Sequence, residues 1–155
     1  CDLTPELVAT LAAEFPNFAG IKDTVDCQSH TRSMIQTTRA VREDFAVLSG
    51  YDEYYIPNLL AGGAGVISGL NNVMPELFVS AREAFKQGDL TALRDIQDQI
   101  GTYMSIYAIG EDFVTTIKTV VSRKFGYCTG VSRNAGGELN EGECRTIDEV
   151  FVVKA

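Results

Sequence analysis

The fold of this chain is decided by the stretch Asn17-Phe18-Ala19-Gly20-Ile21-Lys22-Asp23-Thr24. Its short apolar run, from Phe18 to Ile21, predicts a buried β-strand, and Lys22 lies at the carboxyl end of that strand. Burying an ammonium group is costly, so burial favours the neutral form of a lysine amine. A neutral amine is a nucleophile that forms Schiff bases with carbonyl compounds. Lys22 is therefore a candidate nucleophile, and the alternative is a structural lysine whose amine reaches water at a strand exit.

Two further short apolar runs follow, at residues 45–49 and 65–68, and a glycine comes directly after each run. Continuous apolar runs of this length are typical of parallel strands that are buried on both faces. Helical patterns at residues 26–43 and 52–61 separate the three runs, and Pro57 fits the second pattern only within its first turn. Strands that alternate with helices predict βαβ units, and therefore a parallel sheet in an α/β protein.

A helix is also expected before the Lys22 strand. Thr4 is its predicted N-cap, and Pro5 occupies its first position. Leu7, Leu11 and Phe15 recur every four residues, so they are expected to form the buried face of this helix.

The alternation of strands and helices stops after Gly88. Helical patterns cover residues 75–87, 90–109, 113–125 and 141–154, with a loop at residues 130–137. The sequence therefore divides into a strand–helix part, residues 1–88, and a helical extension, residues 89–155. Tyr103 and Tyr107 lie on an apolar stripe of the extension, and they are expected in its core or at an oligomer interface.

Composition and charge argue against several classes of protein. The formal net charge of -8 disfavours nucleic acid or an anionic membrane as a partner. No apolar stretch reaches the roughly 18 residues of a membrane helix, and no signal peptide is visible. The four cysteines form no Cys-x-x-Cys pair and His30 is the only histidine, so neither a zinc site nor a Ser-His-Asp triad is expected. Such cysteines suit a reducing, cytoplasmic compartment.

Gly20-Ile21-Lys22-Asp23-Thr24 resembles the Schiff-base lysine segment of the dihydrodipicolinate synthase and N-acetylneuraminate lyase family. Members of this family are class I, imine-forming aldolases and lyases on a (β/α)8 TIM barrel. The resemblance covers essentially the whole chain, but only the C-terminal half of a family member. It implies that this chain supplies strands six to eight and the C-terminal helical extension. A three-stranded sheet that cannot close agrees with this, as do 155 residues where a complete barrel takes about 250.

The resemblance also assigns residues of a site. Lys22 matches the catalytic lysine, which forms a covalent imine without a cofactor or metal. The segment Gly50-Tyr51-Asp52-Glu53 is similar to the Gly-x-Asp-Glu segment of the sialic acid lyases, which implies that Gly50, Asp52 and Glu53 contact substrate hydroxyls. From residue chemistry alone the same segment is an ordinary turn, with Asp52 as a helix cap.

The third strand end carries two more candidates. The family residue that matches Ile67 offers its main chain to the 2-oxo acid, and Ser68 is a further candidate for substrate contact. The sialic acid lyases carry a serine one place later, at the position of Gly69, so sialic acid itself is disfavoured. The alternative is a packed strand with a glycine-rich exit.

The resemblance implies an enzyme that makes or breaks a C–C bond between pyruvate and an aldehyde. Asp23 after the lysine, together with Gly50-Tyr51-Asp52-Glu53, favours a 2-keto-3-deoxy sugar acid as the substrate. Dihydrodipicolinate synthase activity, on pyruvate and aspartate semialdehyde, is the alternative; those enzymes more often have Glu-Ala after the lysine.

Part of the family's site precedes Cys1. The proton-shuttling tyrosine and the carboxylate-binding Thr/Ser pair belong to the N-terminal half, and no tyrosine of this chain matches the catalytic one. The chain begins without a methionine, so the missing half is expected from a separate chain or from another part of the same polypeptide. A non-catalytic remnant is the competing interpretation. The resemblance also implies a homo-oligomer, either a dimer or a tetramer.

Overall fold

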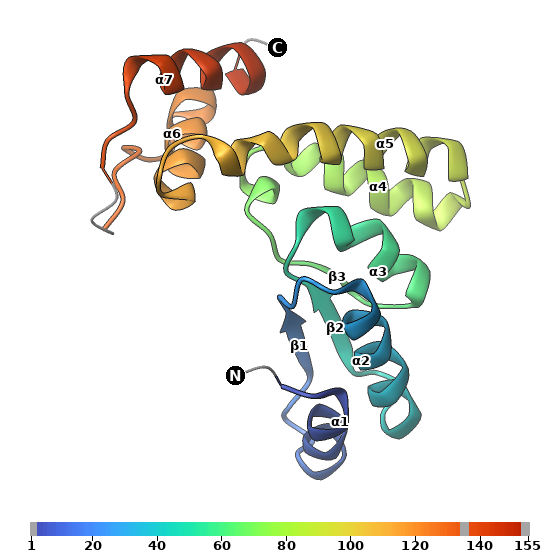
Figure 1. Cartoon of the computed structure of the whole chain (residues 1–155). Helices are drawn as coiled ribbons and strands as arrows, with labels where there is room; N and C mark the ends of the chain where they lie inside the picture. Colours follow the sequence, from blue (N-terminus) through green and yellow to red (C-terminus); the bar gives the residue numbers. More distant parts are fainter. Residues whose placement is uncertain (1–2, 134–136, 153–155) are drawn as a thin grey trace. The chain divides into compact units, whose positions relative to one another are not determined.

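A computed structural model describes residues 3–133 and 137–152 of the chain. It divides into two compact units, Cys1–Ser68 and Gly69–Ala155. The first unit contains the β-sheet, and the second is built from helices (Figure 1). Each unit is therefore considered by itself.

The first unit alternates helices and strands along the chain. Its elements are α1 (Pro5–Glu14), β1 (Gly20–Asp23), α2 (Gln28–Val41), β2 (Ala46–Ser49), η1 (Asp52–Tyr54), α3 (Tyr55–Ala61) and β3 (Gly65–Val66). The three strands are parallel and lie in the order β1-β2-β3. The predicted α/β alternation is confirmed. The strands are shorter than expected, because β1 begins at Gly20 and β3 ends at Val66, so that Ile67 and Ser68 follow the sheet.

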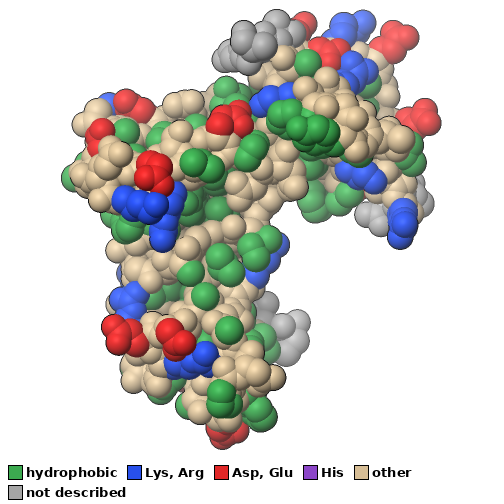
Figure 2. Space-filling view, turned by 180° about the vertical axis from the view of Figure 1, so that it is seen from behind, with side chains coloured by type: hydrophobic (Ala, Val, Ile, Leu, Met, Phe, Trp, Pro, Cys, Tyr) green, Lys and Arg blue, Asp and Glu red, His purple; other side chains and the backbone are tan. Residues whose placement is uncertain are grey.

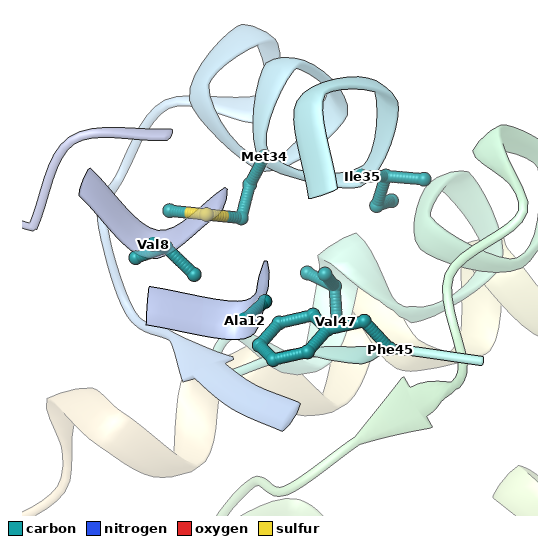
Figure 3. Close-up of a cluster of buried hydrophobic side chains, with 6 residues drawn as sticks. All are labelled: Val8, Ala12, Met34, Ile35, Phe45 and Val47. Atoms are coloured by element: carbon teal, nitrogen blue, oxygen red, sulfur yellow. The ribbon is translucent and has the colours of Figure 1, made fainter. Parts of the chain in front are cut away.

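The core of the first unit lies between α1, α2 and one face of the sheet. Six buried side chains form it: Val8, Ala12, Met34, Ile35, Phe45 and Val47 (Figure 3). The ring of Phe18 packs edge-on against Phe45, with 5.1 Å between the ring centroids. Burying an aliphatic or aromatic side chain of this size stabilises a fold by about 1.5–3 kcal/mol. This cluster therefore holds the two helices against the sheet.

The predicted buried face of α1 is wrong. Leu7 is 46% exposed and Phe15 is 49% exposed, whereas Val8 and Ala12 are buried. Val8 and Ala12 are also four residues apart, so the helical period fits both faces equally well. The helix turns its smaller side chains toward α2, with Ala9 also buried, and this allows the two helices to pack closely.

The ends of the helices follow the local sequence signals. The hydroxyl of Thr4 accepts a hydrogen bond from the Leu7 amide at 3.3 Å, which confirms it as the N-cap of α1. Pro57 lies in the first turn of α3, where the missing N–H of proline leaves no helical hydrogen bond unmade. Gly62 ends α3 with a φ of 90°, a left-handed conformation that favours glycine.

The second unit consists of helices and short helical turns. Its elements are η2 (Leu70–Asn72), α4 (Pro75–Gln87), α5 (Leu90–Tyr103), η3 (Met104–Ala108), α6 (Phe113–Phe125), α7 (Glu141–Ile147) and a π-helical turn, η4 (Asp148–Val152). The predicted helix at residues 90–109 is divided between α5 and η3. The predicted helix at residues 141–154 is divided between α7 and η4, and its end at Lys154 lies outside the described residues.

The helices of the second unit pack through large apolar side chains. Ile100 and Ile106 are fully buried. The hydroxyl of Tyr107 accepts a hydrogen bond from the Leu70 amide at 3.1 Å, and the ring of Tyr103 packs against Phe151 at 5.8 Å. Both tyrosines therefore have packing roles inside this unit, which agrees with the first of their two predicted locations.

The helix α4 packs against α5 within the second unit. The predicted division at residue 88 placed α4 with the strands instead, and that division stays a prediction about the parent barrel. Hydrophobic side chains stand among charged ones on the surface of both units (Figure 2). Within the described ranges, no helix is both long and apolar enough to cross a membrane.

Candidate active site

The carboxyl ends of the three strands bring the predicted site residues to one edge of the sheet. In the parallel register, Lys22 of β1 lies beside Leu48 of β2, which in turn lies beside Gly65 of β3. Neighbouring strands are about 4.8 Å apart, so the backbones at Lys22 and Gly65 are separated by about 10 Å. Gly50 directly follows β2, and Ile67 directly follows β3. All the predicted site residues belong to the first unit.

Lys22 occupies the face of the sheet that the core does not cover. Side chains alternate between faces along a strand, and Ile21 packs against the core while Asp23 bonds to α2. Lys22 and its register partner Leu48 therefore point to the opposite face. A Cβ on Gly65 would lie 3.4 Å from the Leu48 side chain, so this position faces the same way.

Small residues share that face with the lysine. Gly20 and Ala46 pair beside Lys22 and Leu48, and Gly65 completes the set on β3. Such residues leave open space above the sheet around an exposed lysine. The amine of Lys22 is thus accessible to a small reactant on this face. The burial that was expected to favour its neutral form is not found in the described residues, because Lys22 is exposed.

Asp23, the neighbour of the lysine, carries a buried carboxylate with three donors. Its side chain is 3% exposed. The Thr31 hydroxyl donates to Oδ2 at 2.5 Å, His30 Nδ1 lies 3.1 Å from the same oxygen, and the Val25 amide donates to Oδ1 at 3.3 Å. The His30 ring nitrogen can act as a hydrogen-bond donor to this oxygen in the tautomer that carries a proton on Nδ1. The sequence pattern missed this network because Thr31 and His30 come from α2.

Glycine is needed at position 50 because the backbone there packs closely against the segment that follows Lys22. Its amide donates to the main-chain oxygen of Asp23 at 2.7 Å. A Cβ at this position would collide with the side chain of Thr24. Only glycine lets the turn after β2 pack against the turn after β1, which gives Gly50 a structural reason beside its proposed contact with substrate.

Asp52 and Glu53 begin the short helix η1. Tyr51 is at the N-cap of η1, without a side-chain capping hydrogen bond, so Asp52 is not the cap that ordinary turn chemistry predicted. Asp52 is 2% exposed, and Glu53 is half-buried. Glu53 is thus the more accessible of the two carboxylates, and their contact with substrate hydroxyls stays a prediction.

Ile67 and Ser68 continue the chain beyond β3. The amide of Ile67 donates to the main-chain oxygen of Ser49 at 2.9 Å, while its side chain is 51% exposed. The carbonyl oxygen is therefore the main-chain group that Ile67 could offer to a substrate. Ser68 is half-buried beside it. The roles of both residues stay predictions.

Two residues near this edge were not singled out by the sequence. The hydroxyl of Tyr54 donates to Asp26 at 2.7 Å, and this hydrogen bond raises the pKa of Tyr54 to about 12. The bond links η1 to the turn after β1. Cys27, in the same turn, lies 3.0 Å from the Ser29 hydroxyl, and that hydrogen bond lowers the pKa of the exposed thiol. Both are contacts between side chains, and neither has a signature in residue spacing.

A hollow of about 220 Å³ borders the lysine. Its lining residues are Leu3, Ile21, Lys22, Asp23, Thr24, Val25, His30 and Met34. They come from β1, α2 and the segments beside them. Across the ranges that the structure describes, no three His, Cys, Asp or Glu side chains converge as metal ligands would.

Parallel strand–helix units are those of an α/β protein, and in (β/α)8 barrels the catalytic residues lie at the carboxyl ends of such strands. The chain belongs to the dihydrodipicolinate synthetase family, whose sequence profile matches residues 1–146.

Three proteins show the extent of this likeness. YjhH of Escherichia coli K12, a probable 2-dehydro-3-deoxy-D-pentonate aldolase, is 41% identical over 117 residues, or 76% of this chain and 39% of that protein. A 4-hydroxy-tetrahydrodipicolinate synthase of Methanoculleus marisnigri is 34% identical over 151 residues, or 97% of this chain and 50% of that protein. The crystal structure of YagE from Escherichia coli K12 in complex with pyruvate superimposes with a TM-score of 0.89 at 32% identity, covering 96% of this chain and 50% of YagE.

YagE is described as a putative 2-dehydro-3-deoxy-D-gluconate aldolase. The chain thus spans about half the length, or less, of the relatives that it matches. The expected family and the α/β architecture are confirmed for the part of the molecule present here.

Proposed function

We propose that this chain carries the Schiff-base lysine of a class I aldolase that acts on a 2-keto-3-deoxy sugar acid. The observation that carries the proposal is the position of Lys22, an exposed amine at the carboxyl edge of a parallel sheet, in a chain of this family. The names of YjhH and YagE support the choice of substrate class, and the pyruvate complex of YagE supports the 2-oxo acid. The imine is covalent and needs no separate cofactor.

The proposed reaction begins with attack of the Lys22 amine on the keto carbon of the substrate. Loss of water gives an imine, whose protonated form withdraws electrons from the neighbouring carbon. The C4 hydroxyl then gives its proton to the proton-shuttling tyrosine that this proposal places in the N-terminal half. Its oxygen becomes the carbonyl of the departing aldehyde, the C3–C4 bond breaks, and the electron pair of that bond enters an enamine. Protonation at C3 followed by hydrolysis releases pyruvate and restores the amine. Carbon–carbon bond formation is the same sequence in reverse.

Other residues of the edge take supporting roles in this proposal. Asp52 and Glu53 accept hydrogen bonds from hydroxyls of the sugar chain, and Gly50 allows the substrate to approach the backbone. Ile67 presents its carbonyl oxygen to the 2-oxo acid, with Ser68 as a further contact. The accessibility of Glu53 supports its assignment. The amide of Ile67 already donates to Ser49, which leaves its carbonyl oxygen for the substrate and supports that assignment.

The proposed activity needs the rest of a barrel. In this proposal the chain provides strands six to eight and the helical extension, and strands one to five come from a second chain or from another part of the same polypeptide. The unpaired edge of β1 and the coverage of half of YagE support it. A homo-oligomer, either a dimer or a tetramer, and a reducing, cytoplasmic setting belong to the same proposal. The free thiols of Cys27, Cys128 and Cys144 favour that setting.

A second function is favoured by one finding. The relative from Methanoculleus marisnigri, which aligns with 97% of this chain, is a 4-hydroxy-tetrahydrodipicolinate synthase. Condensation of pyruvate with aspartate semialdehyde is therefore the alternative activity. A non-catalytic chain is the third alternative, because the chain spans only about half the length of the relatives that it matches.

Release of pyruvate tests the three alternatives. The assay uses the assembled enzyme, meaning this chain together with strands one to five, in one polypeptide or as a co-expressed chain. Cleavage of 2-dehydro-3-deoxy-D-gluconate or the pentonate, abolished by Lys22→Ala and retained by Lys86→Ala, is the expected result. Lys86 is an exposed helical lysine and serves as the matched control. Preferred turnover of aspartate semialdehyde supports the synthase, and no turnover of any substrate supports the non-catalytic chain.

A further inference from the structure

The carboxylate of Asp23 has no part in the proposed reaction, although it directly follows the lysine. Its side chain is 3% exposed, and a buried charge is costly unless hydrogen bonds compensate for it. Thr31, His30 and the Val25 amide provide three such bonds, two of them from one helix. The burial of the Asp23 carboxylate, and the three hydrogen bonds that offset its cost, therefore need a physical explanation.

Asp23 joins the end of β1 to three parts of the first unit. Its side chain is bound by α2, through Thr31 at 2.5 Å and His30 at 3.1 Å. Its main-chain oxygen accepts the Gly50 amide at 2.7 Å, which ties it to the turn after β2. Its Oδ1 also accepts the Val25 amide, which closes the turn directly after the strand. The residue next to the amine-bearing one is therefore fixed from several directions.

The strand itself is short. β1 has four residues, and among the described residues it pairs with β2. The ends of short strands open with small free energies, and this holds even when a further strand pairs with the other edge of β1 in the assembled enzyme. The hydrogen bonds from α2 to Asp23 therefore hold the end of β1, and with it Lys22, more firmly than the strand pairing does by itself.

Asp23 and Lys22 point to opposite faces of the sheet. The Asp23 side chain bonds to α2 on the core side, whereas Lys22 is exposed on the other side. Lys22 and Asp23 both border the hollow beside β1, but the Asp23 carboxylate is buried and already bound by α2. Its effect on the reaction is therefore expected to pass through the backbone that both residues share.

We infer that Asp23, held by Thr31 and His30, is a positioning residue that fixes the Lys22 amine for imine formation. This inference rests on the proposed function of Lys22. Misplacement of a reacting group by about 1 Å lowers rates by about 100-fold, so anchoring the strand end matters for chemistry as well as for stability. Substrate binds on the face of the sheet that carries Lys22, opposite Asp23, and its binding is left largely unchanged. Loss of the Asp23 contacts should therefore lower kcat and not change KM.

The helix α2 offers a matched control for this inference. Thr31 and Thr38 are both buried, at 3% and 1% exposure. The hydroxyl of Thr38 donates to the Met34 carbonyl of its own helix at 2.7 Å, whereas that of Thr31 donates to Asp23. Thr31→Val and Thr38→Val therefore remove the same group from the same helix, and only the first removes a bond to the anchor. Thr31→Ser keeps the hydroxyl.

The experiment measures kcat and KM for cleavage in the assembled enzyme, with thermal unfolding of each variant alongside. Thr31→Val should lower kcat by about tenfold or more with little change in KM, because the amine is less well placed. Thr38→Val should keep the kcat of the parent enzyme, and Thr31→Ser should restore most of the loss. Should Thr31→Val fail to fold, Asp23→Asn, which keeps the side-chain volume, is measured in its place with the same expected loss of kcat.

Three results overturn the inference: an unchanged kcat in Thr31→Val, an equal loss in Thr38→Val, or a change confined to KM. Failure of the proposed function is seen separately. In that case the parent enzyme itself gives no borohydride-trapped pyruvate adduct on Lys22. A parent enzyme that is trapped on Lys22, with Thr31 variants that turn over normally, rejects the positioning role alone.

Discussion

At the scale of single residues, the chemistry depends on how differently two neighbours are placed. Lys22 is exposed above a face lined by Gly20, Ala46 and Gly65, whereas Asp23 is buried among three donors on the other face. The period of two along a strand produces this separation. The Lys-Asp pair thus gives an accessible amine and a buried anchor from adjacent positions.

The proposed hydroxyl-binding carboxylates can be separated from a structural role by two assays. Glu53→Ala should lower cleavage of a polyhydroxylated sugar acid by about tenfold or more, because a site built for a hydroxyl discriminates strongly when that contact is lost. Exchange of the C3 protons of pyruvate should change little, since pyruvate has no distal hydroxyl. Asp52→Asn is expected to behave in the same way. An equal loss in both assays would instead indicate that these residues maintain the turn.

Tyr54 supplies a prediction about high pH. Its hydrogen bond to Asp26 raises the pKa of Tyr54 to about 12, from the ordinary value of 10.0. A raised folded-state pKa means that this bond contributes fully below about pH 10 and is lost as the pH rises through about 12. Absorbance titration should show one phenolate forming late in the parent protein and missing in Tyr54→Phe. If the absorbance difference between the parent and Tyr54→Phe instead develops near pH 10, Tyr54 does not make its hydrogen bond to Asp26.

At the scale of the elements, the sequence predicted the kinds of element better than their orientations. Three short apolar runs, two of them followed directly by glycine, correspond to the three strands, and the predicted N-cap at Thr4 marks a real helix end. The buried face of α1 could not be predicted, because Leu7 and Val8 belong to two stripes with the same period. The choice between them depends on contacts with α2, which no local pattern contains.

The candidate site was predictable to a similar extent. Lys22, Gly50 and Ile67 follow from the rule that parallel strands end at one edge, and the structure brings them there. The contacts of Asp23 with Thr31 and His30 join positions seven and eight residues apart across a strand–helix turn. Such contacts depend on how α2 packs, so residue spacing alone did not indicate them.

The exposed stripe of α1 gives a prediction at this scale. Leu7 and Phe15 lie on the helix that precedes β1, and β1 pairs with a strand on only one edge among the described residues. The other strand–helix units of a barrel would pack beside that free edge. Leu7→Ser should therefore leave the fold of the isolated chain unchanged but weaken its association with strands one to five. Val8→Ser, in the core, should destabilise both. Circular dichroism and sedimentation of each variant measure the two effects, and normal association of Leu7→Ser would show that the stripe is an ordinary surface.

At the scale of the whole molecule, the chain contains one part of a barrel and the helices that follow it. A parallel sheet of three strands leaves two open edges, and open edges favour pairing with other strands. The isolated chain is therefore expected to associate, and not to behave as a stable monomer. A cooperative unfolding transition of a monomer, seen by sedimentation and circular dichroism, would show that these residues form a self-sufficient domain.

We expect Lys22 to form an imine with a 2-oxo acid once the remaining strands are present. Pyruvate and borohydride are added to the assembled enzyme and to the isolated chain, and the modified peptide is located by mass spectrometry. A reduced pyruvate adduct is expected on Lys22 in the assembled enzyme, with much less of it in the isolated chain and none in Lys22→Ala. An adduct on Lys118 or Lys124 in place of Lys22, or no adduct in the fully assembled protein, would show that Lys22 is not the nucleophile.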